Sequence, residues 1–436
     1  MYDLAILNGQ LYIEGSLKKQ HLYINGDHIV AISDEVHQAR EVYDATDRWV
    51  MPGLIDPHVH FELDCGKYTS SDDFYTGSIA AAYGGITTVI DFLDPISSEK
   101  ELEKAFNDRN QLAGKSMIDY RFHVTVKDPV NEVSSIVETM KTLGLNSIKL
   151  FTTYSDSGRR TYDGEIIELL KLSGEEGFIV LAHIEKDESI TMEPSYTAED
   201  LPISRPEMAE TEEALKLATF AKETGGHLYM VHVSSGNTLE ALVKEFSEIL
   251  GENLYLESCP HYFEFNEERF EGKQGHLYTM APPLRSEVSR EKLINGFDQL
   301  HTIATDHCPF TAQQKKQKHL LGMPLGIGGV EHSFSLMATR YGIKAIDKMS
   351  TMPAKIFGLY PKKGCLEVGT DADIAIYNPH MTHKIDTDHS KAGYTVFKGI
   401  EVNGQIESTL CKGQFIIKNN TLVIGSVGHF NHLGKK

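Results

Sequence analysis

The segment Met51-Pro-Gly-Leu-Ile-Asp-Pro-His-Val-His-Phe61 joins an apolar run to two histidines that lie one residue apart. In an extended strand, side chains at positions i and i+2 point to the same face, so His58 and His60 can bind one cation together. With 20 histidines in 436 residues, chance alone gives roughly one such pair. The pair therefore predicts a metal site only if other strands supply further ligands.

The middle of the chain alternates short apolar segments with helical patterns, which is typical of βα units around a parallel sheet. The clearest amphipathic helix is predicted at Met208–Thr224. Eight such units in about 300 residues favour a TIM-like (β/α)8 barrel. A doubly wound open sheet is the alternative, but no G-x-G-x-x-G follows the first strand. The eight predicted strands are 54–60, Ile86–Phe92, Tyr120–Val126, Ser147–Phe151, Phe178–His183, His227–Val233, Asn253–Ser258 and His301–Asp306.

Both ends of the chain read as short strands separated by turn signals. Leu4–Leu7 and His21–Ile24 are each followed by Asn-Gly, a pair that tolerates the positive φ angles of hairpin turns. Turn signals at the far end are Asn403-Gly404, Lys412-Gly413 and Asn419-Asn420, and the strands there are Asp373–Tyr377, Phe415–Lys418 and Thr421–Ile424. We therefore expect an α/β protein, with a small β-sandwich domain at 1–50 and 360–436 and the barrel at 51–359.

The overall composition narrows the class of protein. A net charge of −20 argues against nucleic acid or an anionic membrane as the main partner. The five cysteines are widely spaced and form no C-x-x-C pair, which favours a reducing compartment over a disulfide framework. The chain shows no signal-peptide pattern and no apolar run of the ~20 residues that a membrane span needs. We expect a cytoplasmic protein.

Two segments between the predicted elements are long and polar. Ile184–Pro206 is predicted to be a lid or a binding loop, because long loops in compact enzymes often have these roles. Thr311–His319 is rich in lysine and is predicted to be a mobile loop with solvated charges. The pair Arg159-Arg160 either attracts an acidic group of a substrate or forms a solvated surface pair.

The ends of the predicted barrel strands contain the residues best suited to chemistry. Strand ends supply His58 and His60, then His183, His232 and finally Asp306. Catalytic groups of such barrels come from these carboxyl ends. One histidine after an apolar strand is usually structural, but four histidines and an aspartate at the same end favour a metal centre.

Lys149 lies within the fourth predicted strand, where both faces of the strand are buried. A buried ammonium group is costly without a partner, and a side chain that snorkels to solvent is the alternative. A cluster of divalent cations would repel an ammonium group. A lysine modified by carbon dioxide instead becomes an anionic carbamate, which is able to bridge two metals, so we expect Lys149 to be N6-carboxylated.

Eight motifs follow one another along nearly the whole chain: Pro52-Gly-Leu-Ile-Asp-Pro-His-Val-His60, Ser71-Asp-Asp-Phe-Tyr-Thr-Gly77, Gly85-Ile-Thr-Thr-Val-Ile-Asp-Phe92, Lys149-Leu-Phe-Thr-Thr-Tyr154, Val231-His-Val-Ser-Ser235, Pro282-Pro-Leu-Arg285, Ala304-Thr-Asp-His-Cys-Pro-Phe310 and Gly329-Val-Glu331. In these motifs and their order the sequence resembles the amidohydrolase superfamily. Within it, the sequence is most similar to the cyclic amidohydrolase branch, the dihydropyrimidinases and D-hydantoinases.

This resemblance implies a centre of two divalent metal ions, usually zinc. A hydroxide between the metals would attack the scissile carbonyl, with Asp306 as general base and then general acid. The hydroxyl of Tyr154 would support the developing oxyanion. Carboxylated Lys149 would bridge the two ions. The six implied metal ligands are His58, His60 and Asp306 for one ion, His183 and His232 for the other, and Lys149 for both.

The resemblance also implies a substrate class. A dihydropyrimidine or a 5-substituted hydantoin would be opened to an N-carbamoyl amino acid by a homo-oligomer, a dimer or a tetramer. Dihydroorotases have arginine directly after the H-x-H pair, where this chain has Phe61, and allantoinases lack the tyrosine found here at Tyr154. These two activities stay alternatives. A non-catalytic dihydropyrimidinase-related scaffold is a third alternative, which the complete ligand set disfavours.

Two positions depart from the family pattern. The family motif Ser-Pro-Pro-Leu-Arg begins here with Ala281, and the family motif Pro-Asn-Gly contains Leu325 in place of asparagine. The family residues contact the ring through backbone groups, which alanine and leucine also possess. The loop 63–68 is expected to line the pocket for the ring substituent. The predicted substrate-binding residues are Tyr154, Ala281, Leu325, Leu63, Cys65 and Phe151.

Overall fold

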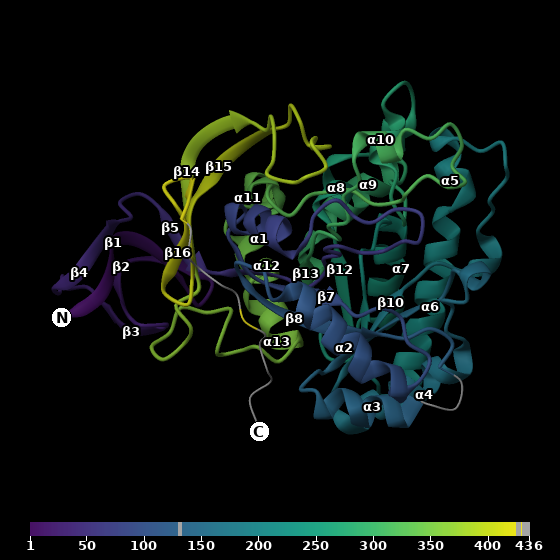
Figure 1. The fold of residues 1–436 in the computed structure, drawn as a ribbon, viewed down its shortest axis with the longest axis horizontal. Coiled ribbons are helices and arrows are strands. Elements are labelled where there is room, and N and C mark those ends of the chain that lie inside the picture. Colours follow the sequence, from purple (N-terminus) through teal and green to yellow (C-terminus); the bar gives the residue numbers. More distant parts are fainter. Residues whose placement is uncertain (130–132, 424–428, 430–436) are drawn as a thin grey trace.

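The computed structural model describes residues 1–129, 133–423 and 429. Two sheets lie next to each other in Figure 1, and helices surround one of them. The other sheet contains both ends of the chain, seen as purple and yellow strands that lie together on the left. The chain is therefore an α/β protein in which strands from the N-terminal and the C-terminal part of the sequence share one sheet.

Eight parallel strands, β6 to β13, form a nearly closed barrel in the part of the chain that the structure describes. Each strand pairs with the next in chain order. The gap between first and last is bridged where Val59 pairs with His307 and the His60 N–H donates to the His307 carbonyl, 2.9 Å away. This confirms the predicted barrel over the open sheet. The strands are Leu54–Asp56, Ile86–Phe92, Asp119–Thr125, Ser147–Phe151, Ile179–His183, Leu228–Met230, Leu254–Ser258 and Thr302–Ile303.

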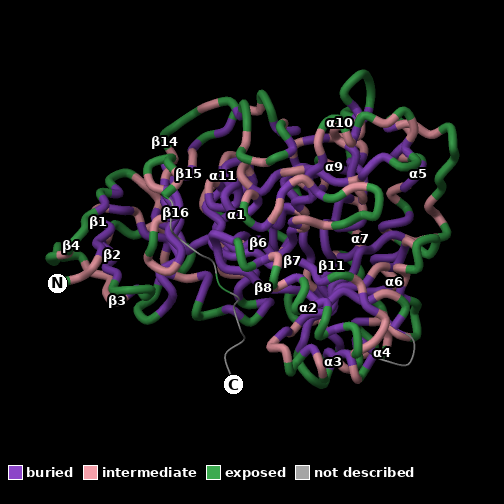
Figure 2. The backbone as a smooth tube through the Cα atoms, in the orientation of Figure 1, coloured by how far each residue is buried: buried purple, intermediate pink, exposed green. Residues whose placement is uncertain are grey.

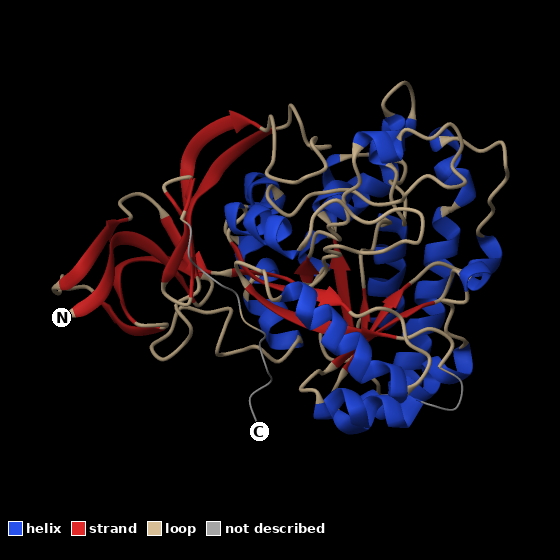
Figure 3. Cartoon of the chain, viewed as in Figure 1, coloured by secondary structure: helices blue, strands red, loops and turns tan. Residues whose placement is uncertain are grey.

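The barrel strands are the most buried part of the chain. Strand β7 (Ile86–Phe92) is buried at all seven positions and is rich in β-branched residues, as expected for a parallel strand covered on both faces. Figure 2 shows the same burial in purple through the middle of the barrel, and Figure 3 shows the strands enclosed by helices. Side chains with polar groups in this environment need specific partners.

The helices around the barrel begin and end at recognisable signals. Helix α6 (Glu207–Thr224) matches the predicted helix within one residue and ends at Gly225, whose φ of 70° is the left-handed conformation common after a helix. Among the described residues, no helix is long and apolar enough to cross a bilayer. The remaining α-helices are α1 Phe74–Tyr83, α2 Glu99–Ala113, α3 Val133–Thr142, α4 Asp163–Glu176, α5 Leu201–Ser204, α7 Gly236–Phe246, α8 Pro260–Glu264, α9 Glu287–Asn295, α10 Ala312–Lys315, α11 Ser333–Tyr341, α12 Lys344–Met349 and α13 Thr351–Ile356.

The second sheet is mixed and contains nine strands in the described residues. Strand β5 pairs with β1 from the N-terminal end and with β14 from the C-terminal end, and an apolar core separate from that of the barrel lies within this region. This confirms the small β domain expected from both termini; its residue boundaries stay a prediction. The strands are β1 Tyr2–Ile13, β2 Ser16–Asn25, β3 His28–Ser33, β4 Ala39–Asp44, β5 Trp49–Pro52, β14 Ile374–Lys384, β15 Glu401–Cys411, β16 Gln414–Lys418 and β17 Thr421–Leu422.

Two of the predicted turns are wrong. Asn8-Gly9 lies within β1, where the φ of Asn8 is 63° and the pairing register shifts, so the left-handed residue forms a bulge. Asn403-Gly404 lies within β15, where a side chain on Gly404 would collide with the ring of Tyr377. The turn at Asn25-Gly26 is confirmed. The turns at Lys412-Gly413 and Asn419-Asn420 are confirmed too, while Ile424 lies outside the described residues.

Candidate metal centre

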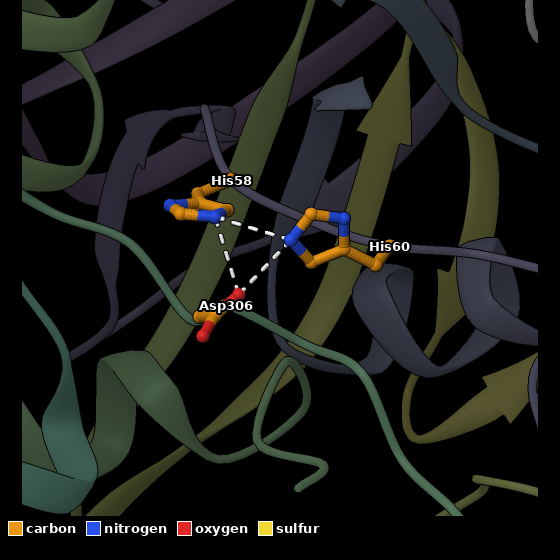
Figure 4. Close-up of side chains that lie close together, drawn as sticks. All are labelled: His58, His60 and Asp306. Carbon is orange, nitrogen blue, oxygen red and sulfur yellow. Dashed lines mark hydrogen bonds and ion pairs between the residues drawn. The ribbon is translucent and has the colours of Figure 1, made fainter. Parts of the chain in front are cut away.

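Three of the predicted ligands meet at the point where the barrel closes. The Nε2 atoms of His58 and His60 lie 3.2 Å apart, and each lies 3.1 Å from Oδ1 of Asp306. Figure 4 shows these three atoms as the corners of a small triangle. Ligand atoms bound at zinc distances in a tetrahedral arrangement are about 3.3 Å apart. The spacing of the triangle therefore fits one cation.

Two further histidines form a second group beside the first. Nδ1 of His183 lies 3.0 Å from Nε2 of His232. His183 is the last residue of β10, and His232 lies two residues beyond β11. The ring centres of His58 and His232 are 5.4 Å apart, which places the two groups next to each other. The five residues thus supply two neighbouring sets of imidazole and carboxylate atoms.

Buried carboxylates orient the histidines of both groups. Oε1 of Glu257 lies 2.8 Å from Nδ1 of His58 and accepts a hydrogen bond from the backbone N–H of His232. Oε2 of Glu185 lies 2.6 Å from Nε2 of His183. A histidine that donates one ring N–H to a carboxylate leaves the other nitrogen free to bind a metal. This pattern directs Nε2 of His58 and Nδ1 of His183 toward the centre.

The electrostatics of the first group favour a bound cation. Burial alone would lower the pKa of His58, but the charges of Glu257 and Asp306 outweigh it and raise that pKa to about 9. Burial lowers the pKa of His60, and it lowers the pKa of His183 to about 4. The carboxylates therefore hold a positive charge at His58. A metal ion bound to the neutral imidazole would supply that charge in place of the proton.

Lys149 lies in β9 and is buried, with 2% of its surface exposed. Its Nζ atom stands 5.5 Å from the centre of the Phe92 ring and 5.2 Å from that of Phe151. Burial lowers its pKa to about 8, partly offset by the charges of Asp306 and Glu257. Among the described residues no carboxylate forms an ion pair with it. The side chain does not reach solvent, so the snorkelling alternative is excluded.

Three of the candidate residues have left-handed backbones. The φ angles are 69° for Tyr154, 41° for His232 and 49° for Asp306. For a residue other than glycine such a conformation costs about 1 to 3 kcal/mol, and it is concentrated at functional sites. Each left-handed residue turns the backbone just after a strand ends, and this turn places its side chain at the barrel mouth. This is why β11 and β13 are shorter than the segments predicted at His227–Val233 and His301–Asp306.

Tyr154 and Phe151 lie beside the predicted metal ligand His183. The ring of Tyr154 lies 5.4 Å from the ring of His183, and that of Phe151 lies 6.0 Å from it. The Tyr154 hydroxyl accepts a hydrogen bond from Nη2 of Arg205 at 3.2 Å. Burial raises the pKa of Tyr154, so its hydroxyl keeps its proton at neutral pH.

The other predicted substrate-binding residues lie on surrounding loops. The Leu63 N–H donates to Oγ of Ser70, whose hydroxyl donates to the His60 carbonyl, so this loop is tied to a ligand. Cys65 is exposed on the same loop. Ala281 and Leu325 are half-buried on two segments that are joined by a hydrogen bond from Gly326 N–H to the Thr279 carbonyl.

One expectation about the loops is wrong. Lys315 lies in the segment predicted to be solvated, yet its side chain is completely buried. Its ammonium group donates to the carbonyl oxygens of Thr279 and Gly326, both at 2.6 Å. These bonds hold together the segments that contain Ala281 and Leu325. Two acceptors in a closed space offset the cost of removing the charge from water.

The long loop Ile184–Pro206 contains residues that sequence reasoning missed. Glu185 and Arg205 lie at its two ends and are both buried against the site. A signal for Glu185 was present, because a metal-binding histidine usually donates its other ring N–H to a carboxylate or carbonyl, and Glu185 lies two residues after His183. Glu257 gave a weaker signal, a charged residue within a buried strand.

Comparison with known proteins identifies the family. The sequence pattern of the amidohydrolase family matches residues 49–416. The chain belongs to the amidohydrolase family. A D-hydantoinase of Geobacillus stearothermophilus is 32% identical over 96% of this chain and 93% of its own length. A D-phenylhydantoinase of Escherichia coli is 30% identical over 99% of this chain and 98% of its own.

Solved structures agree with this assignment. A D-hydantoinase from a Bacillus species superimposes with a TM-score of 0.94 at 28% identity, and the match covers 100% of both chains. The resemblance that the sequence motifs indicated is confirmed, and so is the expectation of a hydrolase. The relatives span the mixed sheet as well as the barrel, so both parts of this chain are shared with them.

Proposed function

We propose that this amidohydrolase opens the amide bond of a cyclic ureide or imide, a dihydropyrimidine or a 5-substituted hydantoin, to give the N-carbamoyl amino acid. The observation that supports it most strongly is the triangle of His58, His60 and Asp306 beside the pair of His183 and His232. The names of the most similar relatives point to the same substrate class.

The donor set suits two divalent ions. His58, His60 and Asp306 would hold one, His183 and His232 the other, and N6-carboxylated Lys149 both. Imidazole and carboxylate donors in this number are typical of zinc, and an anionic carbamate would balance the two cations. Such ions supply a nucleophilic water near neutral pH and polarise the carbonyl that is attacked.

The side chains of this protein perform the remaining steps. Asp306 takes the proton from the attacking water and delivers it to the departing amide nitrogen. Its carboxylate stands beside both histidines of the triangle, and therefore where the attacking water would be activated. The Tyr154 hydroxyl donates to the oxygen on which negative charge develops. Phe151, Leu63 and Cys65 border the ring substituent, and the backbones of Ala281 and Leu325 hold the ring.

The assembly and location form part of the same proposal. We expect a homo-oligomer, a dimer or a tetramer, in the cytoplasm. All five cysteines are free thiols in the structure, which fits a reducing compartment. Sedimentation of the purified protein measures the assembly directly.

Metal analysis followed by a ring-opening screen tests the function. Purified protein should contain about two divalent ions per chain and should open dihydrouracil or hydantoins with a 5-alkyl or 5-aryl substituent faster than allantoin or dihydroorotate. Hydrolysis of dihydroorotate alone would show the branch assignment to be wrong. Protein without stoichiometric metal and without activity on any of these rings would support a scaffold role instead.

A further inference from the structure

Arg205 is a buried arginine at the end of the loop Ile184–Pro206, with 3% of its surface exposed. Its Nη2 atom donates to the Tyr154 hydroxyl at 3.2 Å and to Oε2 of Glu185 at 2.6 Å. Its Nε atom also donates to Glu185, at 3.1 Å. The guanidinium group therefore joins the tyrosine proposed to support the oxyanion to the carboxylate that orients His183.

Two of the sequence motifs fix the position of Arg205. Nη1 of Arg285, the last residue of the Pro282–Arg285 motif, donates to the Arg205 carbonyl at 2.7 Å. Nε of Arg285 donates to Oγ of Ser234, in the Val231–Ser235 motif, at 2.9 Å. Arg285 also pairs with the buried carboxylate of Glu210 at 3.2 Å. These residues have no place in the chemistry proposed so far. Arg285 bonds the backbone of Arg205, and Ser234 and Glu210 hold Arg285 in place.

The chemistry of the guanidinium group decides the direction of the Tyr154 hydroxyl. Arginine has only donors, so the phenol oxygen must accept from it. The single phenol proton then points elsewhere, and in the described residues the bond from Arg205 is the one hydrogen bond of this hydroxyl. A hydroxyl whose proton has no protein acceptor is ready to donate to a ligand.

We propose that Arg205 is a positioning residue that directs the Tyr154 O–H toward the oxyanion of the substrate. This inference rests on the proposed ring-opening function. Arg205 occupies the acceptor side of the phenol and cannot accept its proton, and its ion pair with Glu185 holds the guanidinium in place. Tyr154 contacts the substrate, whereas Arg205 acts through Tyr154.

Arg205→Lys is the variant that separates the contact with Tyr154 from the ion pair with Glu185. An ammonium group keeps the positive charge beside Glu185, but a single nitrogen lacks the planar fork that spans both partners. We expect kcat to fall by about 10- to 100-fold while KM changes by less than about 3-fold, because the lost bond acts on the transition state. The metal content, measured by plasma mass spectrometry, should be unchanged.

The double variant Tyr154→Phe with Arg205→Lys provides the decisive comparison. If Arg205 acts through the phenol, adding Arg205→Lys to Tyr154→Phe should lower kcat by less than about 3-fold further. Arg290→Lys is the matched control, because Arg290 pairs with Glu287 on helix α9 and should leave kcat unchanged. Equal losses in the two backgrounds would overturn the proposal, and so would full activity of Arg205→Lys.

Two further outcomes separate the possible failures. Loss of metal in Arg205→Lys would overturn the proposal, since it would show that the residue acts through His183. If this variant does not fold, Arg205→Gln is measured in the same two backgrounds, with the same criteria. Wild-type protein that opens no cyclic amide would refute the proposed function itself, whereas active wild type with additive losses refutes only the role of Arg205.

Discussion

Two groups of buried ionisable side chains in this protein differ in whether a lysine of the chain itself neutralises their carboxylates. At the barrel mouth, His58, His60 and Asp306 place ligand atoms within 4.8 Å of one another, and at the junction with the mixed sheet Asp119, Asp373 and Cys411 do the same. The junction already contains its cation. Nζ of Lys363 lies 2.8 Å from Asp119 and 3.0 Å from Asp371, and it also bonds Asp373.

The pKa shifts show the consequence of this difference. Burial alone would lower the pKa of Lys363, but the charges of Asp373 and Asp119 hold it well above its usual value. At the mouth, burial prevails and lowers the pKa of Lys149 to about 8. A lysine in a closed ion pair is structural, whereas a buried lysine without an ion-pair partner beside a cluster of histidines indicates a candidate functional site. Buried lysines and carboxylates thus form structural ion pairs at the junction and a candidate metal centre at the barrel mouth.

Lys149→Met removes the anionic bridge and should give the largest effect. Ring opening should fall by on the order of 10⁴-fold, because metal-assisted attack is lost with the ligand that both ions share. The metal content should fall below two ions per chain, while the melting temperature without metal stays close to that of metal-free wild type. A Lys149→Met protein with full metal content and full activity would show the carbamate proposal to be wrong.

Lys363→Met tests the other half of the comparison. It leaves Asp373 without an ion-pair partner, while Asp119 keeps Lys412 at 3.0 Å and Asp371 keeps Lys362 at 4.0 Å. The change should lower the free energy of unfolding by about 3 to 5 kcal/mol. Urea denaturation of metal-loaded protein measures this loss, and the protein that stays folded should keep its metal content and its kcat. A loss of metal with unchanged stability would place the functional cation at the junction instead.

The destabilisation by Lys363→Met should depend on pH. In the wild type, burial would raise the pKa of Asp119, but Lys363 holds it below the ordinary 3.8. The stabilisation from ionised Asp119 is therefore complete at pH values above 3.8, and it is lost as the pH falls through the lower pKa of Asp119 in the folded protein. Without Lys363 the carboxylates are expected to bind protons more readily. The difference in unfolding free energy between wild type and variant should shrink as the pH falls toward and below 3.8.

The sequence predicted the barrel and the cluster of candidate ligands at its mouth because both follow from local patterns. Short apolar segments followed by histidine or aspartate place those residues at one end of a parallel barrel wherever the strands end. The left-handed bends at His232 and Asp306 could not be predicted, since no glycine or turn signal marks either position. The partners Glu257 and Arg205 depend on which strands and loops lie next to each other, and no local spacing encodes that.

Two residues show how local reasoning reaches its limit. Phe61, which distinguished this chain from one group of relatives, packs in the core, where its ring fills the space that a side chain on Gly77 would need. Lys315 stands in a polar run that reads as solvated, yet it is buried. In both cases distant segments determine the environment. The turn errors at Asn8-Gly9 and Asn403-Gly404 have a common origin, since the left-handed residues Asn8 and Gly404 lie within paired strands at shifts of register rather than in turns.

Glu257→Gln should give the smallest of these effects and refines the picture of the barrel mouth. Glutamine keeps an oxygen that can accept from His58 and from the His232 N–H, but it removes the negative charge and places a donor among groups that donate. Metal affinity should weaken by about 10- to 100-fold, as is usual when a carboxylate behind a ligand is replaced. Competition with a chromogenic chelator measures this affinity.

Glu407→Gln is the control, because Glu407 pairs with Arg48 in the mixed sheet and should leave the affinity unchanged. Equal metal affinities of Glu257→Gln and wild type would mean that the charge of Glu257 does not contribute to the centre and that His58 is oriented by packing alone.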